Sequence, residues 1–170
     1  MLECVDDEPE TAELLNYLSV DLAAGGDARG ALGAIREAVE IRRRLAKANP
    51  ARFESDLATS LNNLSPRLSD TGDRRGALGA IREAVEIRRR LAKANPARFE
   101  PDLAASMGSL GTVLRAARRP EEAVRAFSEG VRIIEPHARA MPEGPPARRL
   151  SALEADLKIT QETIRDGEGQ

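Results

Sequence analysis

The stretch Arg29–Glu54, RGALGAIREAVEIRRRLAKANPARFE, recurs without a single change at Arg75–Glu100, an offset of 46 residues. A block of 26 identical residues cannot arise by chance, so the chain contains an internal repeat. The similarity continues on the N-terminal side, where three leucines align with three others one repeat later: Leu15, Leu18 and Leu22 with Leu61, Leu64 and Leu68. A third, more diverged copy begins at about Pro101. Repeats of this length indicate units that stack on their neighbours and share no single central core.

The first half of each copy has the spacing of a helix. In the second copy four leucines follow one another at steps of four, three and four residues: Leu57, Leu61, Leu64 and Leu68. These steps place the leucines on one helix face. We expect a helix of about 16 residues, roughly 24 Å long. Gly72 can then adopt a positive φ, and Asp73 can cap the next helix.

The second half of each copy, which is the identical block, predicts a longer helix. Its apolar residues recur at helical spacing up to Asn95-Pro96, a pair that ends helices: Ala77, Ile81, Ala84, Ile87, Leu91 and Ala94. The helix should span about 21 residues, roughly 31 Å. Its alanines permit close approach to the preceding helix, so each copy is expected to form an antiparallel hairpin that leaves apolar surface for the next copy.

The third copy resembles the tetratricopeptide repeat family, whose signature combines a large apolar residue, Leu-Gly, then Ala, Phe, Ala and a terminal Pro. The matching residues are Met107, Leu110-Gly111, Leu114, Ala123, Phe127, Gly130 and Pro136. The usual period is about 34 residues, so about 12 additional residues are expected to lengthen the second helix and the loop that follows it. Because Leu61-Asn62-Asn63-Leu64 is similar to a common kinesin light chain motif, the chain looks like that long-repeat variety.

The resemblance and the spacing together predict an all-α fold, a right-handed α-solenoid of three antiparallel helix-turn-helix repeats plus a C-terminal capping helix. The expected repeats fill residues 8–136, divided at 8–54, 55–100 and 101–136. Pro and Gly then suggest a loop over 137–146, and Leu150, Leu153 and Leu157 indicate a capping helix over 147–165. The tail, residues 166–170, should be disordered.

The family resemblance implies a peptide-binding groove lined by the first helix of each copy, in which Asn side chains bond the peptide backbone. The candidate contacts are Asn16, Tyr17, Thr59, Asn62, Asn63 and Arg115. An amide suits this role because it offers donors and an acceptor together. The alternative is that Asn62 and Asn63 are solvated or bonded to the adjacent loop. Gly108 and Ser109 replace the amides in the third copy, so the Asn ladder should end there.

Two other features have competing interpretations. Pro66 lies inside a predicted helix, where it should cost about 3 kcal/mol and cause a kink. Such a kink could expose the Asn62 carbonyl toward a ligand; the alternative is that Pro66 is tolerated drift. The strings IRRRLAK form two basic clusters, Arg42–Lys47 and Arg88–Lys93, which could contact phosphate. The alternative is a solvated face with ion pairs between Glu40 and Arg44 and between Glu86 and Arg90. One Tyr and three Phe leave little to stack on bases, which argues against nucleic-acid binding.

Composition and charge argue against several classes of function. The net charge of -2 provides no overall attraction for nucleic acid or an anionic membrane. No signal-like start and no stretch of about 20 apolar residues is present, so we expect a cytoplasmic protein. Cys4 is the only cysteine and His137, expected in a surface loop, is the only histidine; no metal site, cofactor or enzymatic activity is predicted.

The expected function is therefore a protein–protein interaction scaffold or adaptor that binds a peptide or partner helix. Two alternatives stay open: a self-associating repeat module, since near-identical copies can also stack between chains, and a regulatory fragment of a larger signalling protein. Phosphate or nucleic-acid binding by the basic helices is the weakest option. Neither the partner nor the pathway follows from the sequence, because this fold serves many unrelated functions.

Overall fold

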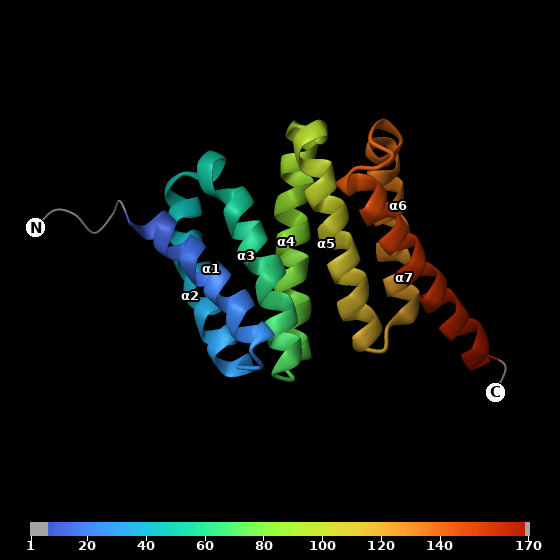
Figure 1. The fold of residues 1–170 in the computed structure, drawn as a ribbon, viewed down its shortest axis with the longest axis horizontal. Coiled ribbons are helices and arrows are strands. Elements are labelled where there is room, and N and C mark those ends of the chain that lie inside the picture. The colour runs from blue at the N-terminus through green and yellow to red at the C-terminus, as the bar shows by residue number, and fades with distance from the viewer. Residues whose placement is uncertain (1–6, 169–170) are drawn as a thin grey trace, which may run out of the picture. The chain divides into compact units, whose positions relative to one another are not determined.

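The computed structural model describes residues 7–168, and within that range every regular element is an α-helix (Figure 1). The helices are α1 (Glu8–Ala24), α2 (Ala28–Ala48), α3 (Pro50–Asp70), α4 (Arg74–Ala94), α5 (Pro96–Ala116), α6 (Pro120–Ala140) and α7 (Pro145–Glu168). The chain divides into two compact units, unit 1 (Met1–Ile87) and unit 2 (Arg88–Gln170), with the boundary inside α4. The predicted all-α class is confirmed. Cys4 lies outside the described residues.

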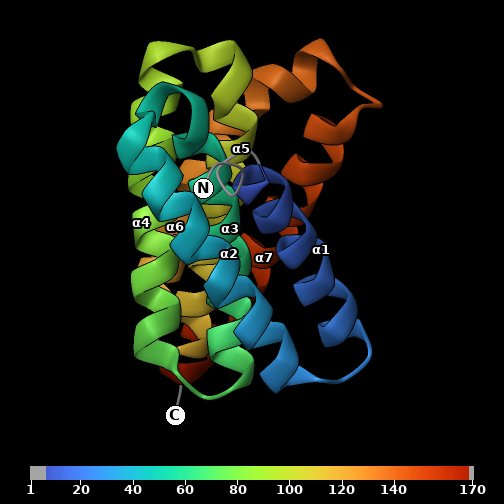
Figure 2. The same cartoon turned by 90° about the vertical axis from the view of Figure 1, so that its left-hand side faces the viewer.

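The turns inside the hairpins follow the sequence prediction. Gly26 and Gly72 have φ values of 85° and 88°, a region that favours glycine. The carboxylates of Asp27 and Asp73 then accept hydrogen bonds from the backbone N–H groups three residues later, at 2.9 and 2.8 Å. Each pair of glycine and aspartate therefore ends one helix and begins the next. In Figures 1 and 2 the α1–α2 turn and the α2–α3 connection lie at opposite ends of the hairpin.

The connections between copies differ from the prediction. Asn49 and Asn95 cap the following helix, each accepting a hydrogen bond at 3.2 Å from a backbone N–H, and Pro50 and Pro96 occupy its first turn. The expected long loop is absent between α2 and α3, and α3 has 21 residues, as α2 does. The prediction of about 16 residues for the first helix of a copy fits α1, which has 17 residues, but was wrong for α3 and α5, which have 21 residues each. In these two copies the long period lengthens both helices, because Pro suits the first turn of a helix as well as its end.

Small residues bring the helices of unit 1 together. Ala12 of α1, Ala31 and Ala38 of α2 and Ala58 of α3 are completely buried. The Ser65 hydroxyl donates a 2.9 Å hydrogen bond to the carbonyl of Ala77 in α4. The helix α3 continues past the neighbouring Pro66 to Asp70, and the expected kink there stays a prediction.

In unit 2, the helix α7 packs on α5 and α6. Leu153 of α7 is 4% exposed and packs so closely on α5 and α6 that a Cβ at Gly108 or Gly130 would lie 3.0 or 3.2 Å from its methyl groups. The helix α6 does not stop at Pro136 but continues to Ala140, and α7 starts at Pro145. The connection between α6 and α7 covers only residues 141–144, so the expected loop over 137–146 was too long. Residues 166–168 belong to α7, so the prediction of disorder is wrong for them, and 169–170 lie outside the described residues.

Candidate functional site

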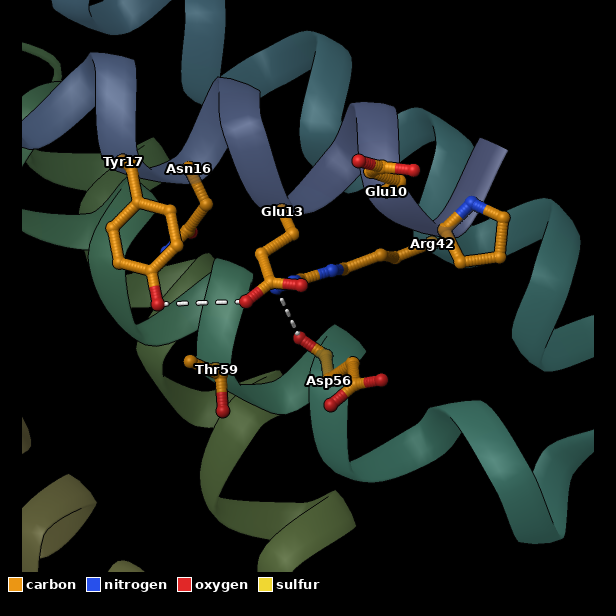
Figure 3. Close-up of a pocket in the computed structure, with 8 residues that line it drawn as sticks. Glu10, Glu13, Asn16, Tyr17, Arg42, Asp56 and Thr59 are labelled. Atoms are coloured by element: carbon orange, nitrogen blue, oxygen red, sulfur yellow. Dashed lines mark hydrogen bonds between the residues drawn. The ribbon is translucent and has the colours of Figure 1, made fainter. Parts of the chain in front are cut away.

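A cavity of about 730 Å³ opens in unit 1 between α1 and α3, with α2 behind it (Figure 3). Its lining residues are Pro9, Glu10, Glu13, Asn16, Tyr17, Arg42, Asp56 and Thr59. Three of the predicted groove contacts are among them, namely Asn16, Tyr17 and Thr59. The structure thus brings these three side chains together with Arg42 and with three carboxylates that the sequence did not assign to any site, those of Glu10, Glu13 and Asp56.

Arg42 is the most buried charged residue of this cavity, with 8% of its surface exposed. Its Nη1 donates to the carbonyl of Asp56 at 3.0 Å and to the hydroxyl of Ser60 at 2.7 Å, which ties α2 to α3. Burial lowers the pKa of Arg42, while Asp56, Glu13 and Tyr17 act in the opposite direction. An arginine starts from a pKa so high that the side chain keeps its charge at neutral pH.

The same arrangement recurs in unit 2. Arg88 is 7% exposed and its Nη1 donates to the carbonyl of Asp102 at 3.0 Å and to the hydroxyl of Ser106 at 2.5 Å. Burial lowers the pKa of Arg88 as well. The first arginine of each IRRR string therefore joins the second helix of one copy to the first helix of the next. A sequence signal for this existed, since Arg42 follows buried Ala38 and Val39 by four and three residues, on their helix face.

The other arginines of the strings point outward but have partners. Arg43 pairs with Glu83 at 2.6 Å and Arg44 with Glu8 at 2.7 Å. Arg89 likewise pairs with Glu129 at 2.9 Å. The expected pair between Glu40 and Arg44 was therefore wrong, because a carboxylate from the neighbouring helix reaches Arg44. Because these arginines are buried or paired, they no longer favour a phosphate site.

The amides of the predicted ladder contact each other. The Asn63 side-chain Nδ2 donates to Oδ1 of Asn16 at 3.3 Å, and the hydroxyl of Ser60 donates to the same oxygen at 3.4 Å. Asn63 is therefore bonded to the preceding copy, neither fully solvated nor tied to its own loop. Nδ2 of Asn16 and Oδ1 of Asn63 remain without a hydrogen-bond partner among the described residues. Asn62 also has an interaction of its own.

Arg115, the last predicted groove contact, lies in unit 2 and is engaged by neighbouring side chains. It pairs with Asp156 of α7 at 3.1 Å, and its guanidinium lies 5.8 Å from the centre of the Phe127 ring. Next to it, α7 covers Gly108, the position where the first two copies have an amide. The loss of the amide in the third copy agrees with this packing, because any Cβ at 108 would lie 3.0 Å from a methyl group of Leu153, which would have to shift.

One face of α1 is apolar and exposed. Of the large hydrophobic side chains that are exposed within residues 7–168, four belong to this helix: Leu14, Tyr17, Leu18 and Val20. We call these four residues the α1 stripe. Leu18 was expected on a buried face, yet it is 46% exposed. In the next copy the Leu14 position is Ser60, which Arg42 of the preceding helix covers, whereas no helix precedes α1 in the described part of the chain.

Other candidate chemistry is sparse in the described part of the chain. Within residues 7–168 no group of three or more His, Cys, Asp or Glu side chains is placed to hold a metal ion. None of the described helices combines the length and apolar character that a membrane span needs. His137 lies in α6, not in a loop, and its Nε2 is 2.7 Å from a carboxylate oxygen of Glu100.

Solved structures resemble this fold at low sequence identity. A kinesin light chain-like protein from Podosopora anserina, with nearly identical TPR-like repeats, has a TM-score of 0.65 and 18% identity, covering 93% of this chain and 69% of its own. The apo form of RapI has a TM-score of 0.64 and 18% identity over 98% of this chain and 57% of its own. A TPR-like protein from Chlorobium tepidum has a TM-score of 0.62 and 19% identity over 90% and 96%.

The sequence itself assigns the family. No curated protein matches it significantly. The pattern that defines the tetratricopeptide repeat matches three times, at residues 11–51, 57–97 and 103–135, which together exceed half of the chain. Three such repeats support a protein–protein interaction scaffold as the general class of function. This chain belongs to the tetratricopeptide repeat family.

Proposed function

We propose that this protein is an interaction scaffold that binds an extended peptide or a partner helix on unit 1, across α1 and α3. The observation that carries the proposal is the cavity between these helices together with the amide pair beside it. The contact residues of the proposal are Asn16, Tyr17, Thr59, Asn62 and Asn63.

The amide pair supports a peptide as the ligand. Asn16 and Asn63 use one donor and one acceptor on each other. What remains at this place is a donor on Asn16 and an acceptor on Asn63, the two groups that a peptide's C=O and N–H require. An extended peptide lying along α1 and α3 could therefore form two backbone hydrogen bonds here without disturbing the existing one.

Replacing both Asn16 and Asn63 by alanine should weaken the binding of a peptide by about tenfold, since two hydrogen bonds at about 0.5–1.5 kcal/mol each are lost. The measurement is isothermal titration with a peptide selected from a displayed random library on the wild-type chain. Circular dichroism should show unchanged helicity, because both side chains are partly exposed.

The matched control is Gln161→Ala on the exposed side of α7, which should leave the affinity as it is. An Asn16→Ala/Asn63→Ala variant that is folded and binds the peptide with wild-type affinity would reject the assignment of the groove to these amides.

The α1 stripe supports a second candidate, self-association through α1. Four exposed apolar side chains on one helix, including Leu14 at 61% and Tyr17 at 60%, form the kind of surface that a second protein copy can cover.

If the chain self-associates through α1, light scattering should give a mass that rises with protein concentration. Leu14→Ser, which introduces the residue that the second copy has at this position, should restore the monomer. A monomeric mass at every concentration would remove this candidate.

A further inference from the structure

We infer that the cavity of unit 1 selects a basic partner: a peptide segment whose lysine or arginine side chain enters between Glu10, Glu13 and Asp56 while a neighbouring apolar residue lies on the α1 stripe. This inference rests on the proposed function and specifies the chemistry of its ligand.

The first argument is charge. Three carboxylates line the cavity, those of Glu10, Glu13 and Asp56, against one cation, Arg42. Among the described residues none of the three carboxylates forms an ion pair. Asp56 uses its backbone carbonyl, not its carboxylate, to bind Arg42. The cavity therefore keeps an excess of negative charge that a cationic ligand would neutralise.

The second argument is the unfinished coordination of Arg42. Its side chain is more than nine-tenths buried and extends between Glu13 and Asp56 in Figure 3. Only Nη1 of the guanidinium donates hydrogen bonds, and no partner of Nε or Nη2 exists in the described part of the chain. A guanidinium has five N–H groups. The remaining ones can donate to a backbone carbonyl of the segment whose basic side chain meets the carboxylates.

The third argument is that the chemistry is specific to the first copy. One repeat later, Leu18 is retained as Leu64 and the acidic Glu10 as Asp56, but the other positions change: Glu13 to Thr59, Leu14 to Ser60, Tyr17 to Asn63 and Val20 to Pro66. The repeated scaffold therefore does not require the carboxylate of Glu13 or the large apolar side chains of Leu14 and Tyr17. Tyr17 belongs to both the cavity and the stripe, and its hydroxyl donates to Glu13 at 3.4 Å, so the two surfaces are contiguous.

These features together favour a protein segment over a nucleic acid. Phosphate groups would be repelled by three carboxylates, whereas Lys and Arg can satisfy them with charge-assisted hydrogen bonds. An apolar neighbour on the segment can cover Leu14 and Leu18, which adds a contribution that does not depend on salt.

The test is selection of a displayed random peptide library on the full chain and on the Glu10→Gln/Glu13→Gln variant. Peptides selected on the wild type should be enriched in Lys or Arg next to a large apolar residue, and those selected on the variant should lose the basic enrichment. Peptides that bind the groove without any basic enrichment would overturn this inference and leave the proposed function intact. Failure to select any peptide that competes for α1 and α3 would count against both.

Affinity measurements sharpen the test. For a selected basic peptide, Glu13→Gln should weaken binding about tenfold, as expected for one charge-assisted hydrogen bond, and the affinity should fall as salt is added. Glu40→Gln, an exposed carboxylate outside the cavity, is the matched control and should bind as the wild type does. Equal affinities of the Glu13→Gln variant and the wild type would overturn the inference.

Discussion

Replacing Arg42 by alanine should lower the free energy of unfolding by about 3 kcal/mol, measured by urea denaturation followed by circular dichroism. The guanidinium donates to the Asp56 carbonyl and to the Ser60 hydroxyl, and hydrogen bonds to a charged group contribute about 1.5–3 kcal/mol. Ser60 is completely buried, so its hydroxyl would also lose a partner in a place that water does not reach. Arg88→Ala should have a similar effect because its two hydrogen bonds repeat those of Arg42.

The neighbouring arginines provide the control for this prediction. Arg43 and Arg44 have the same side chain in the same string, but their ion pairs are exposed, and such pairs contribute about 0–1 kcal/mol. Arg43→Ala and Arg44→Ala should therefore change stability by less than about 1 kcal/mol. Equal losses for Arg42→Ala and Arg44→Ala would show that the buried hydrogen bonds do not hold α2 and α3 together.

The internal repeat made the helical hairpins predictable from the sequence, whereas the connections between copies were not predicted correctly. Leucine and alanine spacing indicated the helices, and Gly72 with Asp73 indicated the turn that the structure has. Asn95-Pro96 was interpreted as a stop, although the same pair is also a good start: Asn caps and Pro fits the first turn. Pro136 shows the converse, since α6 continues through it to Ala140. Helices lie on both sides of Asn95-Pro96, and a Pro alone does not fix where a helix ends.

The candidate site was predictable only in part for a different reason. Asn16, Tyr17 and Thr59 could be named from a family resemblance, but Glu10, Glu13 and Asp56 have nothing in sequence that distinguishes them from solvated charges. Their significance depends on how α1 and α3 pack on α2. The contact between Asn16 and Asn63 joins side chains 47 positions apart, and spacing within one helix carries no information about it.

Gly111→Ala is expected to lower the free energy of unfolding by about 1–3 kcal/mol. A Cβ at this position would lie 2.5–2.7 Å from three ring atoms of Phe127, well inside van der Waals contact. Phe127 is completely buried, so its ring cannot move away without displacing its neighbours. The overpacking should separate α5 from α6 in unit 2, and it should appear as a lower urea midpoint with loss of near-ultraviolet signal from the aromatic residues.

The matched controls are glycines inside α2 and α4 that have open space around them. A Cβ at Gly33 or Gly79 would meet nothing within 4 Å, so alanine there should stabilise the protein by up to about 1 kcal/mol through its better helix propensity. The sign of the effect thus depends on the space beside the glycine and not on the substitution itself. If Gly111→Ala also raised the midpoint, the close approach of α5 and α6 at Phe127 would be refuted, and Gly111 would be a residue that the helix merely tolerates.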